Sequence, residues 1–223
     1  INSNLVLNNV NLIWNGSVGA SGGGIYLQSG SANLDSVNIT GNQGSGIFSD
    51  GGDLILENVI ISNNTGYGLY SNASEINLQF CLINNNSSGI YIDSQSDSSL
   101  IKNVTIVNNY GISSVGSSSM VNCILWNNSS YNINHSVTFS DIQGGWDGEG
   151  NIDIYPLFCD VENGDFNIAL RSPCTGSGQN GSNMGAFDVG CGNSPQLIFP
   201  TVLDTFSTHI NSDTTINFTW NKY

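Results

Sequence analysis

"SVNITGN", residues 36 to 42, is one of six related copies of a short motif, and the fold follows from their repetition. The other copies are "NVNLIWN" (9–15), "NVIISNN" (58–64), "FCLINNN" (80–86), "NVTIVNN" (103–109) and "NCILWNN" (122–128). Aligned on the final asparagine, successive copies are spaced by 27, 22, 22, 23 and 19 residues. A period near 22 residues indicates a solenoid, in which each repeat stacks on the next.

Apolar and polar residues alternate inside each copy, and this pattern predicts strands rather than helices. A second alternating run follows each copy after a Gly-rich corner, as in "SGIFSD" (45–50). Stacked rungs of such strands pair in parallel about 4.8 Å apart and join their inward residues into one core. The sequence therefore predicts an all-β parallel β-helix with coils of about 22 residues, whereas a β-sandwich would not need the same residue types in every copy. The expected inward columns are Leu7, Leu34, Leu56, Leu78, Ile101 and Met120; Val10, Val37, Val59, Cys81, Val104 and Cys123; Leu12, Ile39, Ile61, Ile83, Ile106 and Leu125; and Ile25, Ile47, Leu69, Ile90 and Ile112.

The asparagine that closes each copy is assigned to a corner of the coil. Its side-chain amide can bond to the asparagine of the next rung, as amide ladders do in stacked β-structures. Asparagine also tolerates the left-handed backbone that a tight corner requires. Cys81 and Cys123 share an inward column two rungs apart, roughly 9.6 Å, which is too far for a disulfide. We expect both to be small buried hydrophobes.

The charge balance excludes several classes of partner. Three Lys and Arg residues stand against 17 Asp and Glu, for a formal net charge of −14. Nucleic-acid binding needs a basic surface, and an anionic membrane surface would repel this chain. No apolar run approaches the roughly 20 residues of a transmembrane helix, so we expect no membrane insertion. Neutral ligands or cations fit this charge better than polyanions.

An outward strip on the second strand of each rung is the candidate ligand-binding surface. Aromatic residues directly follow the inward column, and polar residues lie two positions further along the same face. Proteins hold sugars with aromatic rings beside polar groups, and a rung spacing of about 4.8 Å is close to one saccharide unit. Cross-strand packing of aromatic neighbours is the structural alternative. The predicted ligand-binding residues are Tyr26, Phe48, Asp50, Tyr70, Asn72, Tyr91 and Asp93.

The segment "DGEGNID" (147–153) suggests a metal site. Asp147, Glu149, Asn151 and Asp153 place oxygen atoms at every second position, and Ca²⁺ takes six to eight such ligands. It is not an EF-hand, because Ile152 occupies the sixth loop position and no Glu closes the loop. Ca²⁺ is the one cofactor that the sequence suggests, and a polar turn is the alternative.

The evidence for catalysis in the sequence is thin. A polysaccharide lyase needs a base and positive charge or Ca²⁺, and Lys102 is the one basic residue of the regular coils. A glycosidase needs two carboxyl groups about 5 to 9.5 Å apart. Asp50 and Asp93 lie two rungs apart, roughly 9.6 Å, at the edge of the range for inverting enzymes. No catalytic residue is therefore assigned.

From residue 120 onward the sequence resembles a known family. "NCILWNNSSYNI", "VTFSDIQGGWDGEGNIDIYPLF", "ENGDFNIALRSPC" and "NMGAFDVG" are similar to the C-terminal coils of right-handed, pectate-lyase-like parallel β-helix proteins secreted by Bacteroidetes and related bacteria. The resemblance covers about residues 2 to 192 and implies a right-handed fold and a secreted or cell-surface location, but no single activity. Two departures stand out: Tyr155 replaces the usual Asp before Pro-Leu-Phe, and "TGSGQNG" replaces an acidic stretch.

We assign residues 1–192 to the β-helix, with an irregular C-terminal cap from about residue 131. A solenoid needs a cap to cover its open apolar end, and Trp146, Phe158, Phe166 and Phe187 are the expected plugs. The secreted context permits a disulfide between Cys174 and Cys191, with Cys159 as the other candidate partner. Three apolar residues are expected to point outward, each directly before an inward residue of the column that contains Ile61. We expect another segment or a partner to cover them. They are Ile60, Leu82 and Ile124.

Residues 193–223 read as a linker followed by the start of an immunoglobulin-like module or an extended tail. The chain is then a piece of a longer extracellular protein, whose other domains would be its partners. The favoured function is non-catalytic: polysaccharide or cell-surface glycan binding, adhesion or display. A polysaccharide lyase or glycoside hydrolase of the pectate-lyase-like class is the alternative. A structural stalk or secretion-system substrate is a third hypothesis.

Overall fold

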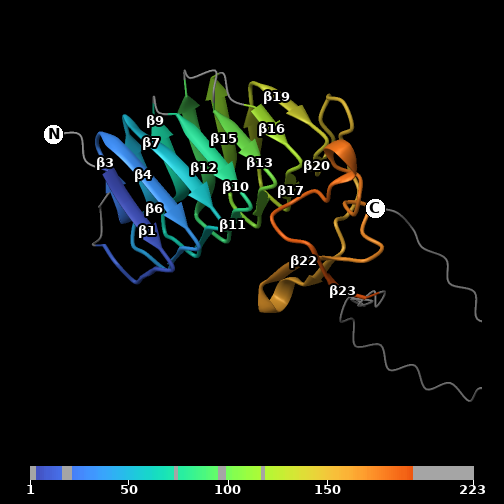
Figure 1. Cartoon of the computed structure of the whole chain (residues 1–223), viewed down its shortest axis with the longest axis horizontal. Coiled ribbons are helices and arrows are strands. Elements are labelled where there is room, and N and C mark those ends of the chain that lie inside the picture. The colour runs from blue at the N-terminus through green and yellow to red at the C-terminus, as the bar shows by residue number, and fades with distance from the viewer. Residues whose placement is uncertain (1–3, 17–21, 73–74, 95–98, 117–118, 193–223) are drawn as a thin grey trace, which may run out of the picture.

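The computed structural model describes residues 4–16, 22–72, 75–94, 99–116 and 119–192. Its strands stack in parallel to form three long sheets, and a small fourth sheet follows them (Figure 1). This arrangement confirms the predicted all-β parallel β-helix. The linker or immunoglobulin-like module predicted for residues 193–223 lies outside the described residues.

The three long sheets take one strand each from every complete rung. Sheet A contains β1 (Asn4–Asn8), β4 (Gly30–Asp35), β7 (Gly52–Glu57), β10 (Ile76–Gln79), β13 (Leu100–Lys102), β16 (Ser119–Val121) and β19 (Ser136–Thr138). Sheet B contains β2 (Asn11–Ile13), β5 (Asn38–Thr40), β8 (Ile60–Ser62), β11 (Leu82–Asn84), β14 (Thr105–Val107), β17 (Ile124–Trp126) and β20 (Asp141–Ile142). Sheet C contains β3 (Gly22–Leu27), β6 (Ser45–Asp50), β9 (Tyr67–Asn72), β12 (Ser88–Ser94), β15 (Ile112–Gly116) and β18 (Tyr131–Ile133). The strand pairing of the rungs therefore continues past residue 131 as far as Ile142.

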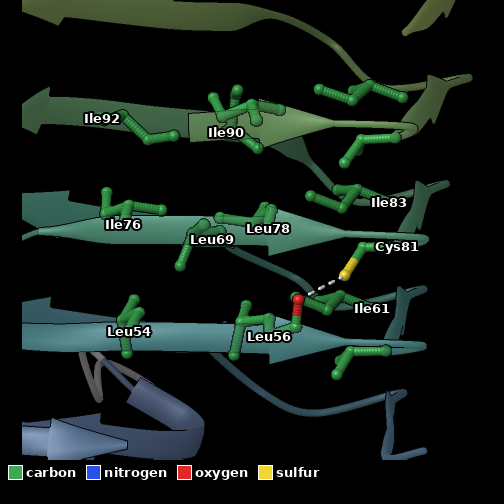
Figure 2. Close-up of a cluster of buried hydrophobic side chains, with 14 of the residues drawn as sticks. Leu54, Leu56, Ile61, Leu69, Ile76, Leu78, Cys81, Ile83, Ile90 and Ile92 are labelled. Carbon is green, nitrogen blue, oxygen red and sulfur yellow. Dashed lines mark hydrogen bonds between the residues drawn. The ribbon is translucent and has the colours of Figure 1, made fainter. Parts of the chain in front are cut away.

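The core is built from the predicted columns. In sheet A, Leu56 pairs with Leu34 on one side and Leu78 on the other, and in sheet B Ile61 pairs with Ile39 and Ile83. Figure 2 shows such side chains from successive rungs lying one above another. The Cys81 thiol also lies in this core and donates to the Leu56 carbonyl oxygen at 3.5 Å. Cys81 and Cys123 are both fully buried and free, as predicted.

The corners are marked by residues with left-handed backbone. The predicted asparagine ladder is present: the Asn64 Nδ2 donates to the Asn86 Oδ1 at 2.9 Å, and the Asn42 Nδ2 donates to the Asn64 Oδ1 at 2.9 Å. The left-handed conformation, however, belongs to the residue before each ladder asparagine, such as Asn63 at φ 55° and Asn85 at φ 54°. A second left-handed column turns the chain from sheet A into sheet B. Its members are Asn9, Ser36, Asn58, Phe80, Asn103, Asn122 and Phe139.

The C-terminal region covers the side of the solenoid more than its end. It contains sheet D, formed by β21 (Phe158–Asp160), β22 (Asp165–Ala169) and β23 (Val189–Cys191), and two 3₁₀ turns, η1 (Val161–Asn163) and η2 (Gln179–Gly181). Phe166 and Phe187 pack against Leu82 on the outer face of sheet B, and Met184 packs against Ile124 there. The prediction that outward apolar residues are covered is thus confirmed.

Two predictions for the cap need correction. Of the four expected plugs, Trp146 packs against the main core, whereas Phe158, Phe166 and Phe187 lie on the outer face of sheet B. That face carries a row of apolar side chains, the apolar stripe, which the C-terminal region shields from water. Its members are Ile60, Leu82, Val107 and Ile124. The predicted Cys174–Cys191 disulfide is wrong: Cys159 pairs with Cys191, and these residues lie on the two outer strands of sheet D. Cys174 is a buried free thiol instead.

Candidate ligand-binding surfaces

Four aromatic residues stand in register along the outer face of sheet C. Tyr26 pairs with Phe48, Phe48 with Tyr70, and Tyr70 with Tyr91, each one rung from the next. Their ring centroids are 5.5, 4.4 and 4.8 Å apart, and the rings are within 10° of parallel. We call these four residues the aromatic column. The strict alternation along β3, β6, β9 and β12 places all four outward, as the sequence predicted.

The rings of the column cover much of one another. Phe48, Tyr70 and Tyr91 are half-buried, whereas Tyr26 at the end of the stack is 54% exposed. Tyr67 adds an edge contact to Tyr70 and Tyr91, with centroids at 5.6 and 6.0 Å. Burial, with smaller effects from Tyr91 and Asp50, raises the pKa of Tyr70. A ligand on this surface would therefore meet ring edges, hydroxyl groups and the exposed Tyr26 ring.

A polar row runs beside the aromatic column. Asp50 pairs with Asn72, and Asn72 pairs with Asp93, so the three side chains occupy one line across β6, β9 and β12. The Asn72 Nδ2 donates to the Asp50 Oδ1 at 3.2 Å. The structure thus brings together all seven residues that the sequence predicted for ligand binding. Carboxylate and amide groups in such a row can accept and donate hydrogen bonds to ligand hydroxyls.

The predicted calcium ligands do not assemble. Among the residues that the structure describes, no three His, Cys, Asp or Glu side chains gather as a metal site. The Asn151 Oδ1 accepts from the Ser140 backbone N–H at 3.0 Å, and the Asp153 Oδ1 accepts from the Gly144 N–H at 3.1 Å. Asp147 and Glu149 are exposed. Residues 147–153 therefore form a turn in which Asn151 and Asp153 satisfy backbone donors.

Asp141 is a titratable residue that the sequence reasoning missed. It is fully buried where β20 meets the C-terminal region. Its carboxylate accepts from the Cys174 thiol at 3.1 Å and from the Ile154 N–H at 3.2 Å. Burial raises the pKa of Asp141 to about 6, and burial together with Asp141 raises the pKa of Cys174. Asp141 is the register partner of Ile124, so the repeat predicts an outward position on sheet B. No local sequence pattern predicts that the C-terminal region covers this position.

The stacked rungs and the buried asparagine ladder define the class of a parallel β-helix repeat protein. The family model described as "Right handed beta helix region" matches residues 2–144, and the chain belongs to this family. No curated protein and no solved structure matches the chain. The part of the chain that the structure describes contains no helix with the length and apolar character needed to cross a membrane.

Proposed function

We propose that this β-helix is a non-catalytic module of a secreted or cell-surface protein that binds polysaccharide along sheet C. The observation that carries the proposal is the aromatic column with its parallel polar row. Both repeat at the rung spacing of about 4.8 Å, so a glycan chain running along the axis would meet similar groups at each saccharide unit. The tyrosine hydroxyls and the row of Asp50, Asn72 and Asp93 supply its hydrogen-bonding partners.

The charge of the chain supports a neutral or cationic polymer as the ligand. Two of the three polar-row residues are carboxylates, and the formal net charge is −14. Like charges approaching such a surface are repelled, whereas neutral hydroxyls accept and donate hydrogen bonds without that cost. The location rests on the resemblance described above. The non-catalytic role rests on the sequence, in which no catalytic residue is assigned, because the fold itself hosts many activities.

The test compares three matched variants for binding to a set of neutral, cationic and anionic polysaccharides. Tyr26→Ala removes the one widely exposed ring of the column, and Tyr70→Ala opens a gap in its middle. We expect each to weaken binding about tenfold, since a sugar-facing aromatic contributes on the order of 1 kcal/mol beyond its buried area. Tyr110→Ala is the control, because Tyr110 is 73% exposed and lies outside the column. Equal binding by wild type, Tyr26→Ala and Tyr70→Ala would refute the proposal.

A further inference from the structure

A groove of about 550 Å³ lies on a different flank, where residues 179–188 cross the corner between sheets A and B. Gln79, Phe80 and Lys102 form one wall, and the loop around Gln179 forms the other. Small-molecule sites typically enclose roughly 300 to 1,000 Å³, so the groove has room for a small ligand. The function proposed for sheet C leaves this groove unused.

The loop wall is held rigidly against the coils. The Gln179 backbone N–H donates to the Asn122 Oδ1 at 2.7 Å, and the Asn122 Nδ2 donates to the Ser182 Oγ at 3.0 Å. The Asn103 Nδ2 donates to the carbonyl oxygens of Asn183 and Gly185 at 3.0 and 3.3 Å. Corner asparagines of two rungs thus clamp the segment in place. A wall fixed before binding lowers the entropy cost of capturing a ligand.

Gly185 shows how closely this segment approaches sheet B. Its φ is 89°, and a Cβ there would lie 2.6 Å from the Ile124 Cδ1 and 2.8 Å from the Thr105 Oγ1. Only glycine fits this position. The path of the segment, and with it the width of the groove, is therefore set by backbone contact.

Phe80 is the unusual residue of the groove. It occupies a left-handed corner, at φ 52°, where the rungs on either side carry Asn58 and Asn103. A bulky side chain in this region is an outlier, and such strain concentrates at functional sites. Phe139 has the same backbone conformation, but its ring lies against Gly150. Phe80, by contrast, is 37% exposed and lines the groove, so part of its surface is open to a ligand.

Polar side chains surround this aromatic ring with balanced charge. Gln79 and Lys102 are register partners at the ends of β10 and β13. Gln179 faces them from the loop, and Asp188, whose Oδ1 accepts from the Asn183 Nδ2 at 3.1 Å, lines the same groove. One ammonium group and one carboxylate cancel, and the amides both donate and accept. This set suits sugar hydroxyls better than a strongly charged ligand.

We infer that the groove is a second carbohydrate site, which takes one or two neutral pyranose units with a sugar face on Phe80. Hydroxyl groups would bond to the Gln79 and Gln179 amides, the Lys102 ammonium and the Asp188 carboxylate. The site does not depend on the aromatic column, since the two share no residue and lie on different sheets. Failure of one proposal therefore leaves the other standing.

The experiment titrates the full chain of 223 residues with maltotriose, cellotriose and tri-N-acetylchitotriose, using calorimetry and the side-chain amide signals in NMR spectra. We expect at least one trisaccharide to bind and to shift the Gln79 and Gln179 amides. Phe80→Ala should weaken that binding about tenfold, and Gln179→Ala should weaken it as well. Tyr110→Ala and Tyr70→Ala should leave it unchanged, because neither residue lines the groove.

Three results would overturn the inference. These are no binding of any of the three neutral trisaccharides, undiminished binding by Phe80→Ala, or tighter binding of a galacturonate trimer, titrated beside them as the charged comparison. A second variant separates loss of the ring from misfolding: Phe80→Asn gives this left-handed corner the residue that Asn58 and Asn103 supply in the neighbouring rungs, so it should fold with an unchanged melting temperature and still lose the binding. Retained binding by a Tyr70→Ala protein that no longer holds polysaccharide would show that the two sites act separately.

Discussion

At the scale of single residues, the ladder asparagines are held by several hydrogen bonds each. The Asn64 Nδ2 donates to the Ile39 carbonyl oxygen at 3.1 Å and to the Asn86 Oδ1 at 2.9 Å. The Asn64 Oδ1 accepts from both the backbone N–H and the side-chain amide of Asn42, each at 2.9 Å. The side chain is almost completely buried, so water cannot replace these partners.

Replacing Asn64 with Ala should lower the free energy of unfolding by about 3 kcal/mol, because the Asn42 backbone N–H and the Ile39 carbonyl oxygen lose this partner in a buried site, and the Asn42 and Asn86 side chains each lose one hydrogen bond. Urea denaturation measures the difference. Asn33→Ala is the control, because Asn33 is an exposed residue of β4, and it should change stability by less than about 0.5 kcal/mol. Similar losses for the two variants would contradict the role of the ladder.

Asp141 makes stability depend on pH. Its pKa rises from 3.8 to about 6 on folding, so the protein is stabilised when the carboxyl group is protonated. This contribution is complete below the unfolded pKa of 3.8 and is lost as the pH rises to the folded pKa of about 6; the total loss above that pH is about 3 kcal/mol. The groups that face Asp141 are the Cys174 thiol and the more distant Asp153 carboxylate, which adds to the upward shift.

Asp141→Asn should therefore gain stability relative to wild type between pH 4 and pH 8, by about 3 kcal/mol. Unfolding free energies across this range measure the gain, and Asp147→Asn, which changes an exposed carboxylate, serves as control. Parallel pH curves for wild type and Asp141→Asn would show that the buried carboxylate is not titrating in this range.

At the scale of elements, the C-terminal region differs from the rungs because it lacks their repeat. In sheet D, β22 lies between β21 and β23, and the Cys159–Cys191 disulfide ties the two outer strands around it. The central strand supplies Phe166, which packs on the outer face of sheet B. The disulfide thus holds together the element that covers the apolar stripe.

The double variant Cys159→Ser/Cys191→Ser should lose about 3 to 4 kcal/mol of stability, since the disulfide restrains a loop of 32 residues in the unfolded chain. Hydrogen exchange should increase in β21–β23 and much less in β4–β14, because stacked rungs depend on their nearest neighbours. The control is Cys81→Val, which places in its column the residue found at Val59 and Val104 and should cost less than about 1.5 kcal/mol. An equal increase of hydrogen exchange in sheets A and D would contradict the prediction that the disulfide stabilises mainly sheet D.

At the scale of the whole molecule, the regular rungs could be predicted because each repeats the same residue types at the same places. Register follows from that repetition, and so do the aromatic column and the polar row. The cap could not be predicted, because its contacts join unrelated segments: the Ala186 N–H donates to the Thr105 Oγ1, 81 residues away. The disulfide pairing, the burial of Asp141 and the groove at Phe80 all depend on that path.

The face-to-face packing of the aromatic column also lay beyond the sequence. Alternation determines that a side chain points outward, but the rotamer that each ring adopts depends on its neighbours. Tyr26 keeps its exposure because it ends the stack with one ring neighbour, whereas Phe48 has a ring on either side and Tyr91, at the other end, also contacts Tyr67. The sequence pattern therefore predicts the register of the strands. It does not predict which part of each ring is exposed to a ligand.

The paired left-handed corners and the ladder have a consequence for how such a chain can change in length. Residues 65 to 86 run from one ladder position to the next, and each boundary carries the same Asn-Asn step. Duplicating or deleting that whole unit would join one Asn-Asn step to an identical step, so each ladder asparagine would still bond to the asparagine of the next rung. Losing a single residue inside a strand would move the following side chains of that strand to the opposite face and set apolar groups against water. The ladder spacings of 19, 23 and 27 residues show that the segments between strands accept smaller changes. The strands themselves are thus built to be copied or lost in complete turns.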